Sequence, residues 1–112
     1  MDCLFCSIVK GEIPSTKVFE DDRVLAFRDI NPQAPVHILV IPKEHIVSVA
    51  EVNEANSAVV AHIFEVIAKI ADSEGLGEGY RVVSNCGAHA CQSVKHLHFH
   101  ILGGRQMADS MA

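Results

Sequence analysis

The sequence lacks several features that would each indicate a particular class of protein. No apolar run in its 112 residues approaches the ~20 residues that a membrane span needs. Basic residues are few, nine against 14 acidic ones, and the net charge of −5 argues against binding to nucleic acid. The first residues contain no basic segment followed by an apolar one, so we expect no secretory signal and a cytoplasmic protein. Repeats, low-complexity tracts and linkers are also absent, and the length predicts one domain over residues 1–112.

The composition is that of a folded protein with two unusual residue types. Hydrophobic residues make up 49% and charged residues 21%, which supplies a core and excludes intrinsic disorder. Seven histidines are present, and three of them fall within five residues. The four cysteines are not expected to form disulfides, because a chain with a substantial core and no leader suits a reducing compartment. Metal binding or burial is the better explanation for them.

Turn signals and periodicity predict an α+β fold with a mostly antiparallel sheet of five short strands and one long helix. Apolar residues at helical spacing between 59 and 71 predict the long helix, with Asn53 as its N-cap and Gly75 at its C-terminal end. The other expected elements are a short helix over 3–9, a hairpin over 16–20 and 24–29, a proline-containing loop over 31–35, and strands over 36–41, 80–84 and 95–102.

Three histidines alternate with apolar residues in the segment His96-Leu97-His98-Phe99-His100. Because side chains alternate along a strand, the imidazoles are expected on one face and the apolar residues on the core face. A metal site is one use of such a row, but three ligands along one straight strand cannot converge within ~2.1 Å of an ion. The other use is chemistry on phosphorus, in which a neutral imidazole attacks and a neighbouring ring stabilises the developing charge. The attacking ring then needs an acceptor that holds its other nitrogen as N–H.

These motifs occur in an order that resembles the histidine triad (HIT) family, in particular its Hint-like branch of bacterial-type, zinc-containing nucleotide-binding proteins. The resemblance runs from about residue 3 to residue 107. It implies a five-stranded antiparallel sheet with one long helix and a short N-terminal helix, usually paired as a homodimer. The matching motifs are Ile13-Pro14, Phe19-Glu20-Asp21-Asp22, Phe27-Arg28-Asp29-Ile30, Pro32-Gln33-Ala34-Pro35, Val40-Ile41-Pro42-Lys43, Gln92-Ser93-Val94 and Gly103-Gly104-Arg105-Gln106-Met107.

The resemblance also implies an activity, the hydrolysis of purine nucleoside monophosphate amides or esters through a transient nucleotidyl-histidine on His98. Water would then release a nucleotide such as AMP or GMP. His100 and Ser93 would contact the phosphate, Ser93 would assist the leaving group, and His37 would hydrogen-bond within the triad network. The remaining nucleotide-binding residues implied are Phe5, Ile8, Phe27 and Ile30 around the purine, Asp29 at the ribose, and Asn85, Gln92 and Val94 with Ser93 around the phosphate.

The pair Cys3-x-x-Cys6 fits a zinc knuckle, a redox pair or two buried thiols. The redox interpretation needs a preceding strand in a thioredoxin-like context, which this position does not offer. Zinc needs four ligands, so two more must come from elsewhere in the chain. The resemblance implies that His45 and His96 complete the set around a structural Zn²⁺.

The sequence departs from the family pattern in two places. Ala90-Cys91 stands where Hint-like proteins usually carry Gly-Gly, which matters if those glycines adopt positive φ. The end of the chain, 108–112, lacks a Trp-containing tail that some relatives use to select the leaving group. Cys86 and Cys91 could form a second zinc pair with His89, but we favour small buried thiols, and we expect His62 and His89 on the surface.

Two other functions compete with the hydrolase. The chain could be a nucleotide-binding regulatory module without significant turnover, or a zinc-stabilised scaffold. The apolar arc of the long helix is broader than one sheet face requires, which favours a dimer under each hypothesis. The sequence leaves the physiological substrate and the choice between adenine and guanine open.

Overall fold

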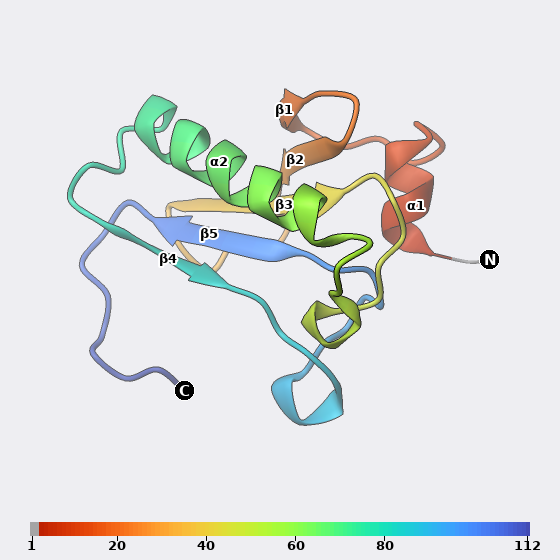
Figure 1. The fold of residues 1–112 in the computed structure, drawn as a ribbon. Helices are drawn as coiled ribbons and strands as arrows, with labels where there is room; N and C mark the ends of the chain where they lie inside the picture. The colour runs from red at the N-terminus through yellow and green to blue at the C-terminus, as the bar shows by residue number, and fades with distance from the viewer. Residues whose placement is uncertain (1–2) are drawn as a thin grey trace.

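The elements of the fold follow the predicted order closely (Figure 1). The structure is a computed structural model that describes residues 3–112. Neither α-helix of this stretch is both long and apolar enough to cross a membrane. The elements are α1 (Leu4–Val9), β1 (Lys17–Glu20), β2 (Val24–Arg28), β3 (Val36–Pro42), the 3₁₀ turn η1 (Val49–Glu51), α2 (Ser57–Ser73), β4 (Tyr80–Val83), the 3₁₀ turn η2 (Ala88–Ala90) and β5 (Phe99–Gly103).

The five strands form one antiparallel sheet in the order β1-β2-β3-β5-β4, which confirms the predicted α+β class. The central strands β3 and β5 come from distant parts of the chain and pair Leu39 with His100 and Val40 with Phe99. The histidine-bearing strand is therefore held between two neighbours. β4 lies at one edge of the sheet.

The two faces of the sheet carry different helices. The long helix α2 crosses one face, and side chains such as Ile63 and Ile67 pack there against Phe99 and Ile101 (Figure 1). The short helix α1 covers part of the other face, where its Phe5 and Ile8 pack against β2 and β3. Because residues alternate along β5, a strand with apolar residues toward α2 presents its intervening side chains toward the α1 side.

The predicted start of the long helix is wrong by a few residues. Asn56, not Asn53, precedes the first residue of α2. The side chain of Asn53 accepts the N–H of Ala55 at 2.8 Å, and the N–H of Asn53 donates to the Asn56 side chain at 2.8 Å. Both asparagines thus build a turn ahead of the helix. Within α2, Phe64 was expected on the apolar arc, but its side chain is 49% exposed.

The strand predicted over 95–102 is also shorter in the structure, because β5 begins only at Phe99. The neighbouring strand β3 ends at Pro42, which has no N–H to donate to a ladder. His96 and His98 therefore lie in an irregular extended segment, where the Leu97 N–H donates to the Ile46 carbonyl at 2.6 Å. The alternation survives this change, since Leu97 still packs in the core on the α2 side.

A contact between His62 and Asp21 attaches α2 to the turn of the β1–β2 hairpin. His62 Nε2 lies 2.6 Å from Asp21 Oδ2, while Asp21 Oδ1 accepts the N–H groups of Arg23 and Val24 at 2.8 Å. The hydrogen bond to Asp21 raises the pKa of His62. Burial alone would raise the pKa of Asp21, but the hydrogen bonds from His62 and the turn outweigh it and lower the pKa to about 2. The predicted surface position of His62 is only partly right, because its side chain is half-buried against the hairpin turn and has a structural role.

We expect this contact to make stability depend on pH. Because the pKa of His62 is raised above its usual 6.5, its stabilising effect is complete below that value and is lost as the pH rises through the folded-state pKa. The Asp21 contribution is present above 3.8 and is lost only as the pH falls toward 2. The difference in melting temperature between the wild type and His62→Gln should therefore be largest below about pH 6.5 and should shrink as the pH rises above that value. A difference that stays constant over this range would contradict a charged His62.

Candidate active site and metal cluster

The three histidines of the predicted triad lie on the α1 side of the sheet, around Phe5. The Phe5 ring makes edge contacts with His96 and His98, with ring centroids 5.9 and 5.1 Å apart. The rings of His98 and His100 are also 5.1 Å apart. His96 and His98 are buried, whereas His100 is half-buried. The row of imidazoles thus extends from the interior toward the surface.

The protonation of His98 is fixed by a backbone carbonyl. His98 Nδ1 lies 2.7 Å from the carbonyl oxygen of His96, and a carbonyl can only accept a hydrogen bond. Nδ1 is therefore the N–H, and Nε2 of the neutral ring keeps its lone pair. Nε2 has no hydrogen-bond partner within residues 3–112. It is also not fully buried, so it retains contact with solvent. His98 has the protonation that a nucleophile requires.

A second carbonyl gives His96 the opposite protonation. His96 Nε2 donates to the carbonyl of Pro42 at 2.8 Å, so Nδ1 carries the lone pair. Burial lowers the pKa of His96, which favours the neutral ring. Nδ1 faces the sulfur atoms of Cys3 and Cys6. Metal-binding histidines usually donate the N–H of the nitrogen that does not bind the metal to a carbonyl or carboxylate, as His96 does here.

Cys3, Cys6, His45 and His96 form a cluster that could hold a metal ion, with all four ligand atoms within 4.8 Å of one another. The Sγ atoms of Cys3 and Cys6 lie 3.3 and 3.6 Å from His96 Nδ1, and Cys6 Sγ lies 3.3 Å from His45 Nδ1. In a tetrahedral zinc site, sulfur and nitrogen ligands are separated by about 3.6 Å, from bond lengths of about 2.3 and 2.1 Å. The four predicted ligands therefore fit zinc. Burial, then Cys3, raises the pKa of the Cys6 thiol, a cost that a bound cation removes.

His37 and His100 form a hydrogen-bonded pair next to the triad. The backbone N–H of Gln33 donates to His37 Nδ1 at 3.0 Å, so the proton of the neutral His37 ring is on Nε2. That N–H donates to His100 Nδ1 at 2.8 Å, which leaves the proton of His100 on its Nε2. Burial, then His98 and His37, lowers the pKa of His100 to about 4, so its ring is neutral near pH 7. His100 therefore offers an N–H donor beside the lone pair of His98.

The predicted phosphate cradle is a loop braced by Gln92. The Gln92 side chain accepts the N–H of Gly87 at 2.9 Å and donates to the carbonyls of Val47 and Val94 at 2.7 and 3.1 Å. Its side chain is thus committed to holding the loop. Ser93, next in the chain, is exposed. The loop presents the Ser93 hydroxyl while Gln92 keeps it in place.

Cys91 adopts a left-handed conformation within this loop, with φ 60° and ψ 40°. The N–H of Gln92 donates to the Gly87 carbonyl and the N–H of Cys91 to the Ala88 carbonyl, both at 3.1 Å. This pair of bonds defines a Schellman motif, whose left-handed position favours glycine. Position 91 therefore needs the positive φ anticipated for the family's glycines. Cys86 and Cys91 are exposed, so the expectation of buried thiols is wrong; the short loop has no core around it.

Replacing Cys91 with glycine should stabilise the protein. Removing the side chain relieves the left-handed conformation, and we expect the free energy of unfolding to rise by about 1 kcal/mol. Ala90 has an ordinary negative φ, so Ala90→Gly is the matched control and should lower stability by about 0.5–1 kcal/mol. Urea titration of both variants measures the two effects, and a destabilised Cys91→Gly would contradict the strain.

The residues predicted around the purine and ribose are placed unevenly. Phe5, Ile8 and Phe27 are buried in the layer between α1 and the sheet, whereas Ile30 is 92% exposed beyond the end of β2. Asp29 is half-buried, and its Oδ1 accepts the N–H of Asn31 at 2.8 Å. Among the phosphate residues, Asn85 and Val94 are half-buried.

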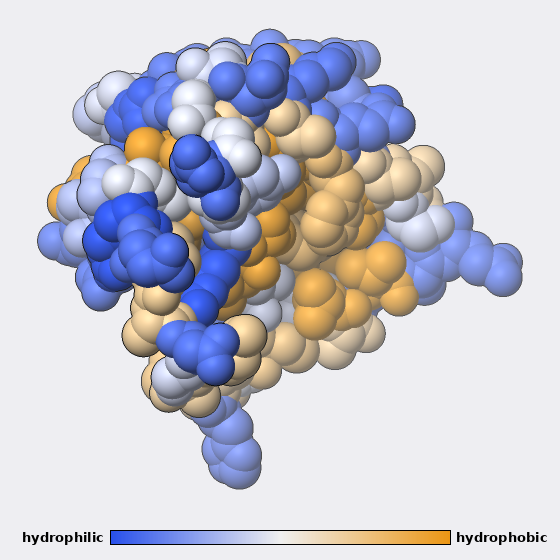
Figure 2. Space-filling model, turned by 90° about the vertical axis from the view of Figure 1, so that its left-hand side faces the viewer, coloured by the Kyte–Doolittle hydropathy of each residue, from blue (hydrophilic) through white to orange (hydrophobic). Residues whose placement is uncertain are grey.

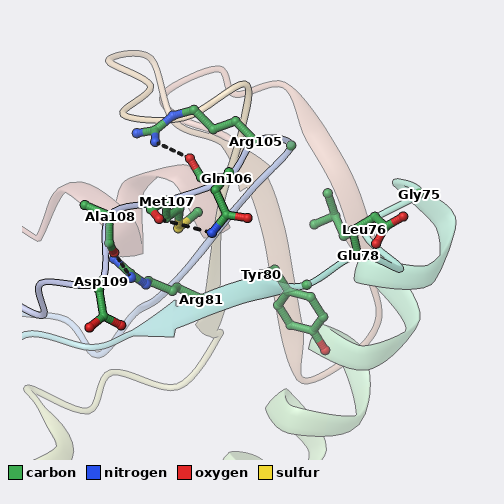
Figure 3. Close-up of a pocket in the computed structure, with 12 residues that line it drawn as sticks. Gly75, Leu76, Glu78, Tyr80, Arg81, Arg105, Gln106, Met107, Ala108 and Asp109 are labelled. Atoms are coloured by element: carbon green, nitrogen blue, oxygen red, sulfur yellow. Dashed lines mark hydrogen bonds between the residues drawn. The ribbon is translucent and has the colours of Figure 1, made fainter.

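Two cavities of about 560 Å³ each adjoin these elements. One is lined by Ser93, Val94 and Lys95 together with the metal-cluster residues Cys3 and His45. The other lies between β4, the turn before it, and the segment 104–109 that follows β5 (Figure 3). Figure 3 shows the Arg81 side chain reaching the backbone of Ala108. Only the first cavity contains predicted site residues.

Three groups that shape the site were not predicted from the sequence. Ser84 Oγ donates to the His98 carbonyl at 2.8 Å and so holds the segment before β5. The carbonyl of Pro42 and the N–H of Gln33 fix the protons of His96 and His37. A serine at a strand end carries no distinctive signal, and backbone groups carry none at all.

Comparison with known proteins agrees with this geometry. A family model described as "Scavenger mRNA decapping enzyme C-term binding" matches residues 2–112. A "14 kDa zinc-binding protein" of Zea mays is 53% identical over 106 residues, which cover 93% of this chain and 83% of that protein. "Adenylylsulfatase HINT1" of Arabidopsis thaliana is 49% identical over 106 residues, 93% of this chain and 72% of that one.

A solved structure described as "HIT family hydrolase from Clostridium thermocellum" superposes with a TM-score of 0.96 and 50% sequence identity. The match covers 99% of this chain and 97% of that one. The sheet, both helices and the histidine-bearing segment therefore have counterparts throughout the relative. With identities near one half over nearly the whole length, the chain belongs to the histidine triad family.

Proposed function

We propose that this protein hydrolyses purine nucleoside monophosphate amides or esters through a covalent intermediate on His98. The observation that carries the proposal is the complementary protonation of two adjacent rings, His98 and His100. His98 Nε2 has a lone pair that reaches solvent, and the adjacent His100 has its proton on Nε2. A nucleophile next to a hydrogen-bond donor is what attack on a charged phosphoryl group requires.

In the proposed reaction His98 Nε2 attacks the α-phosphorus. The N–P bond forms as the P–N or P–O bond to the leaving group breaks, and the leaving group departs with a proton passed from solvent through the Ser93 hydroxyl. The proton on His98 Nδ1 stays on the ring and is donated to the carbonyl of His96, which stabilises the positive ring. Water then attacks phosphorus, the N–P bond breaks, and the nucleoside monophosphate and one proton are released.

The names of two relatives support hydrolysis as the type of reaction. "Adenylylsulfatase HINT1" of Arabidopsis thaliana and the "HIT family hydrolase" of Clostridium thermocellum are each about half identical to this chain. Adenosine phosphoramidate is therefore the test substrate, with the guanosine analogue in parallel to compare the bases. The wild type should release AMP, measured by chromatography. Nucleotide binding without any release of AMP would instead support the regulatory module.

Zinc is the metal we propose for the cluster of Cys3, Cys6, His45 and His96. Two thiolates and two imidazoles in tetrahedral spacing are typical of structural zinc. The name "14 kDa zinc-binding protein" of the relative from Zea mays supports the same choice. The ion would have a structural role, because it would cross-link α1 to the segment that precedes His98. His96 would thereby be held in the orientation that offers its carbonyl to His98.

A homodimer completes the proposal, formed through the open edge of the sheet. In the described part of the chain, β4 pairs with a strand on one side only, so its outer backbone groups can pair with a second copy. Tyr80 and Val82 of β4 are 40% and 37% exposed, and Phe64 of α2 is 49% exposed. Figure 2 views the side on which α2 ends and β4 begins, and shows a broad band of hydrophobic residues there. Such a band on a small protein favours association.

A charge on this surface should separate the two copies. Val82→Glu and Phe64→Glu each place a carboxylate in the apolar contact, and we expect light scattering to give the mass of one chain instead of two. Val49→Glu is the matched control, because Val49 is 41% exposed but lies on the 3₁₀ turn η1, which is not part of the sheet. A wild-type protein that is monomeric at micromolar concentration would contradict the proposed dimer.

A further inference from the structure

The carboxylate of Asp29 is fixed in place by the backbone. Asp29 follows the end of β2, and its N–H donates to the carbonyl of His37 at 3.0 Å. Its Oδ1 accepts the N–H of Asn31 at 2.8 Å, which leaves Oδ2 for other contacts. Oδ2 lies 3.4 Å from His37 Nε2, and the Asp29 side chain is only 18% exposed. The negative charge is thus positioned beside His37 without help from a ligand.

Asp29, His37 and His100 form a connected group, with one donor atom of each within 4.8 Å of the others. Such a set could bind a metal ion, but the protons argue against it. His37 Nδ1 accepts the Gln33 N–H, so the proton of the neutral ring occupies Nε2, the atom that would have to bind the ion. The group is suited instead to keeping a proton on His37 Nε2, which faces both the Asp29 carboxylate and His100 Nδ1.

We propose that Asp29 is a positioning residue for the proton on His100, in addition to the ribose contact implied by the family resemblance. The carboxylate favours the form of His37 that has its proton on Nε2. This N–H donates to His100 Nδ1 at 2.8 Å, so His100 Nδ1 acts as the acceptor. His100 is then left with its N–H on Nε2, available to a phosphate oxygen. The inference rests on the proposed function, because it assigns a role within that reaction.

The surroundings of His100 make this assistance necessary. His98 is the other titratable group that faces His100, with ring centroids 5.1 Å apart, and it becomes positive when it bonds to phosphorus. Among residues 3–112, Asp29 is the one negative charge that raises the pKa of His37 and His100. It offsets the positive charge that develops on His98 and keeps His100 as a donor. Its effect should therefore appear in kcat, because this charge develops only during the reaction.

Assaying two proteins on two substrates separates this role of Asp29 from ribose binding. Wild type and Asp29→Asn are each assayed with adenosine phosphoramidate and with its 2′,3′-dideoxy analogue, which lacks the ribose hydroxyls. We expect Asp29→Asn to lower kcat by about 10- to 100-fold on both substrates. Asn keeps the oxygen that accepts the Asn31 N–H, so the fold should persist. Asp22→Asn, an exposed carboxylate in the β1–β2 turn, is the control and should leave kcat unchanged.

A spectroscopic measurement tests the proton directly. Nitrogen-15 NMR of the histidine rings should find the Nε2–H form of His37 and His100 in the wild type. Asp29→Asn should give a mixture of forms, because the Asn amide would turn its NH₂ toward His37 Nε2 and oppose the Gln33 N–H. An unchanged kcat on the dideoxy substrate, or unchanged ring protonation in the variant, would each overturn the inference. A wild type that releases no AMP would overturn the proposed function instead, and the NMR comparison alone would then decide the role of Asp29.

Discussion

Replacing His98 with alanine is expected to lower the turnover of adenosine phosphoramidate by about 10⁴- to 10⁶-fold, the range seen when a covalent nucleophile is removed. No other ring can take over, because His96 uses its lone pair toward the cysteine sulfurs and His100 uses its Nδ1 to accept from His37. His98 Nε2 combines a lone pair with contact to solvent. Steady-state release of AMP measures the loss.

The covalent intermediate gives a second measurement of the same prediction. An alkaline quench during turnover should preserve the N–P bond, and mass spectrometry should find one nucleotide on a peptide that contains His98. His62→Gln provides the control, because His62 lies on the far side of the molecule in contact with Asp21, and this variant should form the adduct at the wild-type rate. Full activity of His98→Ala, or an adduct on another residue, would eliminate the proposed mechanism.

Removing the metal is expected to have the largest effect on stability. At a free zinc concentration 1,000 times the dissociation constant, bound zinc adds about 4 kcal/mol to the free energy of unfolding. For a chain of this size that corresponds to a fall of about 15 °C in melting temperature when a chelator is added. The fall is expected because the cluster joins Cys3 and Cys6 to His96 and so adds to the packing of Phe5 and Ile8 that holds α1 on the sheet.

Cysteine variants distinguish the cluster from the remaining thiols. Cys3→Ala should reproduce the effect of the chelator and should abolish the response to added zinc. Cys86→Ala is the matched control, because Cys86 is exposed in the phosphate loop and lies outside the cluster. Purified wild-type protein without zinc by elemental analysis, together with an unchanged melting temperature for Cys3→Ala, would refute the proposed metal.

The elements of the fold were predictable because they depend on local patterns. Apolar periodicity located α2, and the alternation around His98 placed Leu97 in the core even where the strand is irregular. The start of α2 was not predictable, because Asn53 and Asn56 have equal intrinsic preference for an N-cap. The choice between them depends on the hydrogen bonds of a turn that forms with the rest of the fold.

The residue types of the candidate site were predictable, but the nitrogen that carries the proton in each histidine ring was not. Spacing and the family resemblance indicated the histidines and cysteines that the fold brings together. Backbone groups of Pro42, Gln33 and His96, which the fold brings to the rings, favour one protonated atom in His96, His37 and His98. For the pair of His37 and His100 we propose that Asp29 supports the same form. No sequence pattern reports the backbone partners, because every residue has the same backbone acceptor.

The wide separation of the metal-cluster residues along the chain has a consequence for biosynthesis. Cys3 and His96 are 93 positions apart, and the ribosome delivers the cysteine long before the histidine. During translation the two N-terminal thiols remain unligated by their final partners, and closing so long a loop carries a substantial entropic cost. The proposed nucleophile, His98, follows two residues after the last proposed ligand, His96, so the candidate site can form only after this segment has been synthesised.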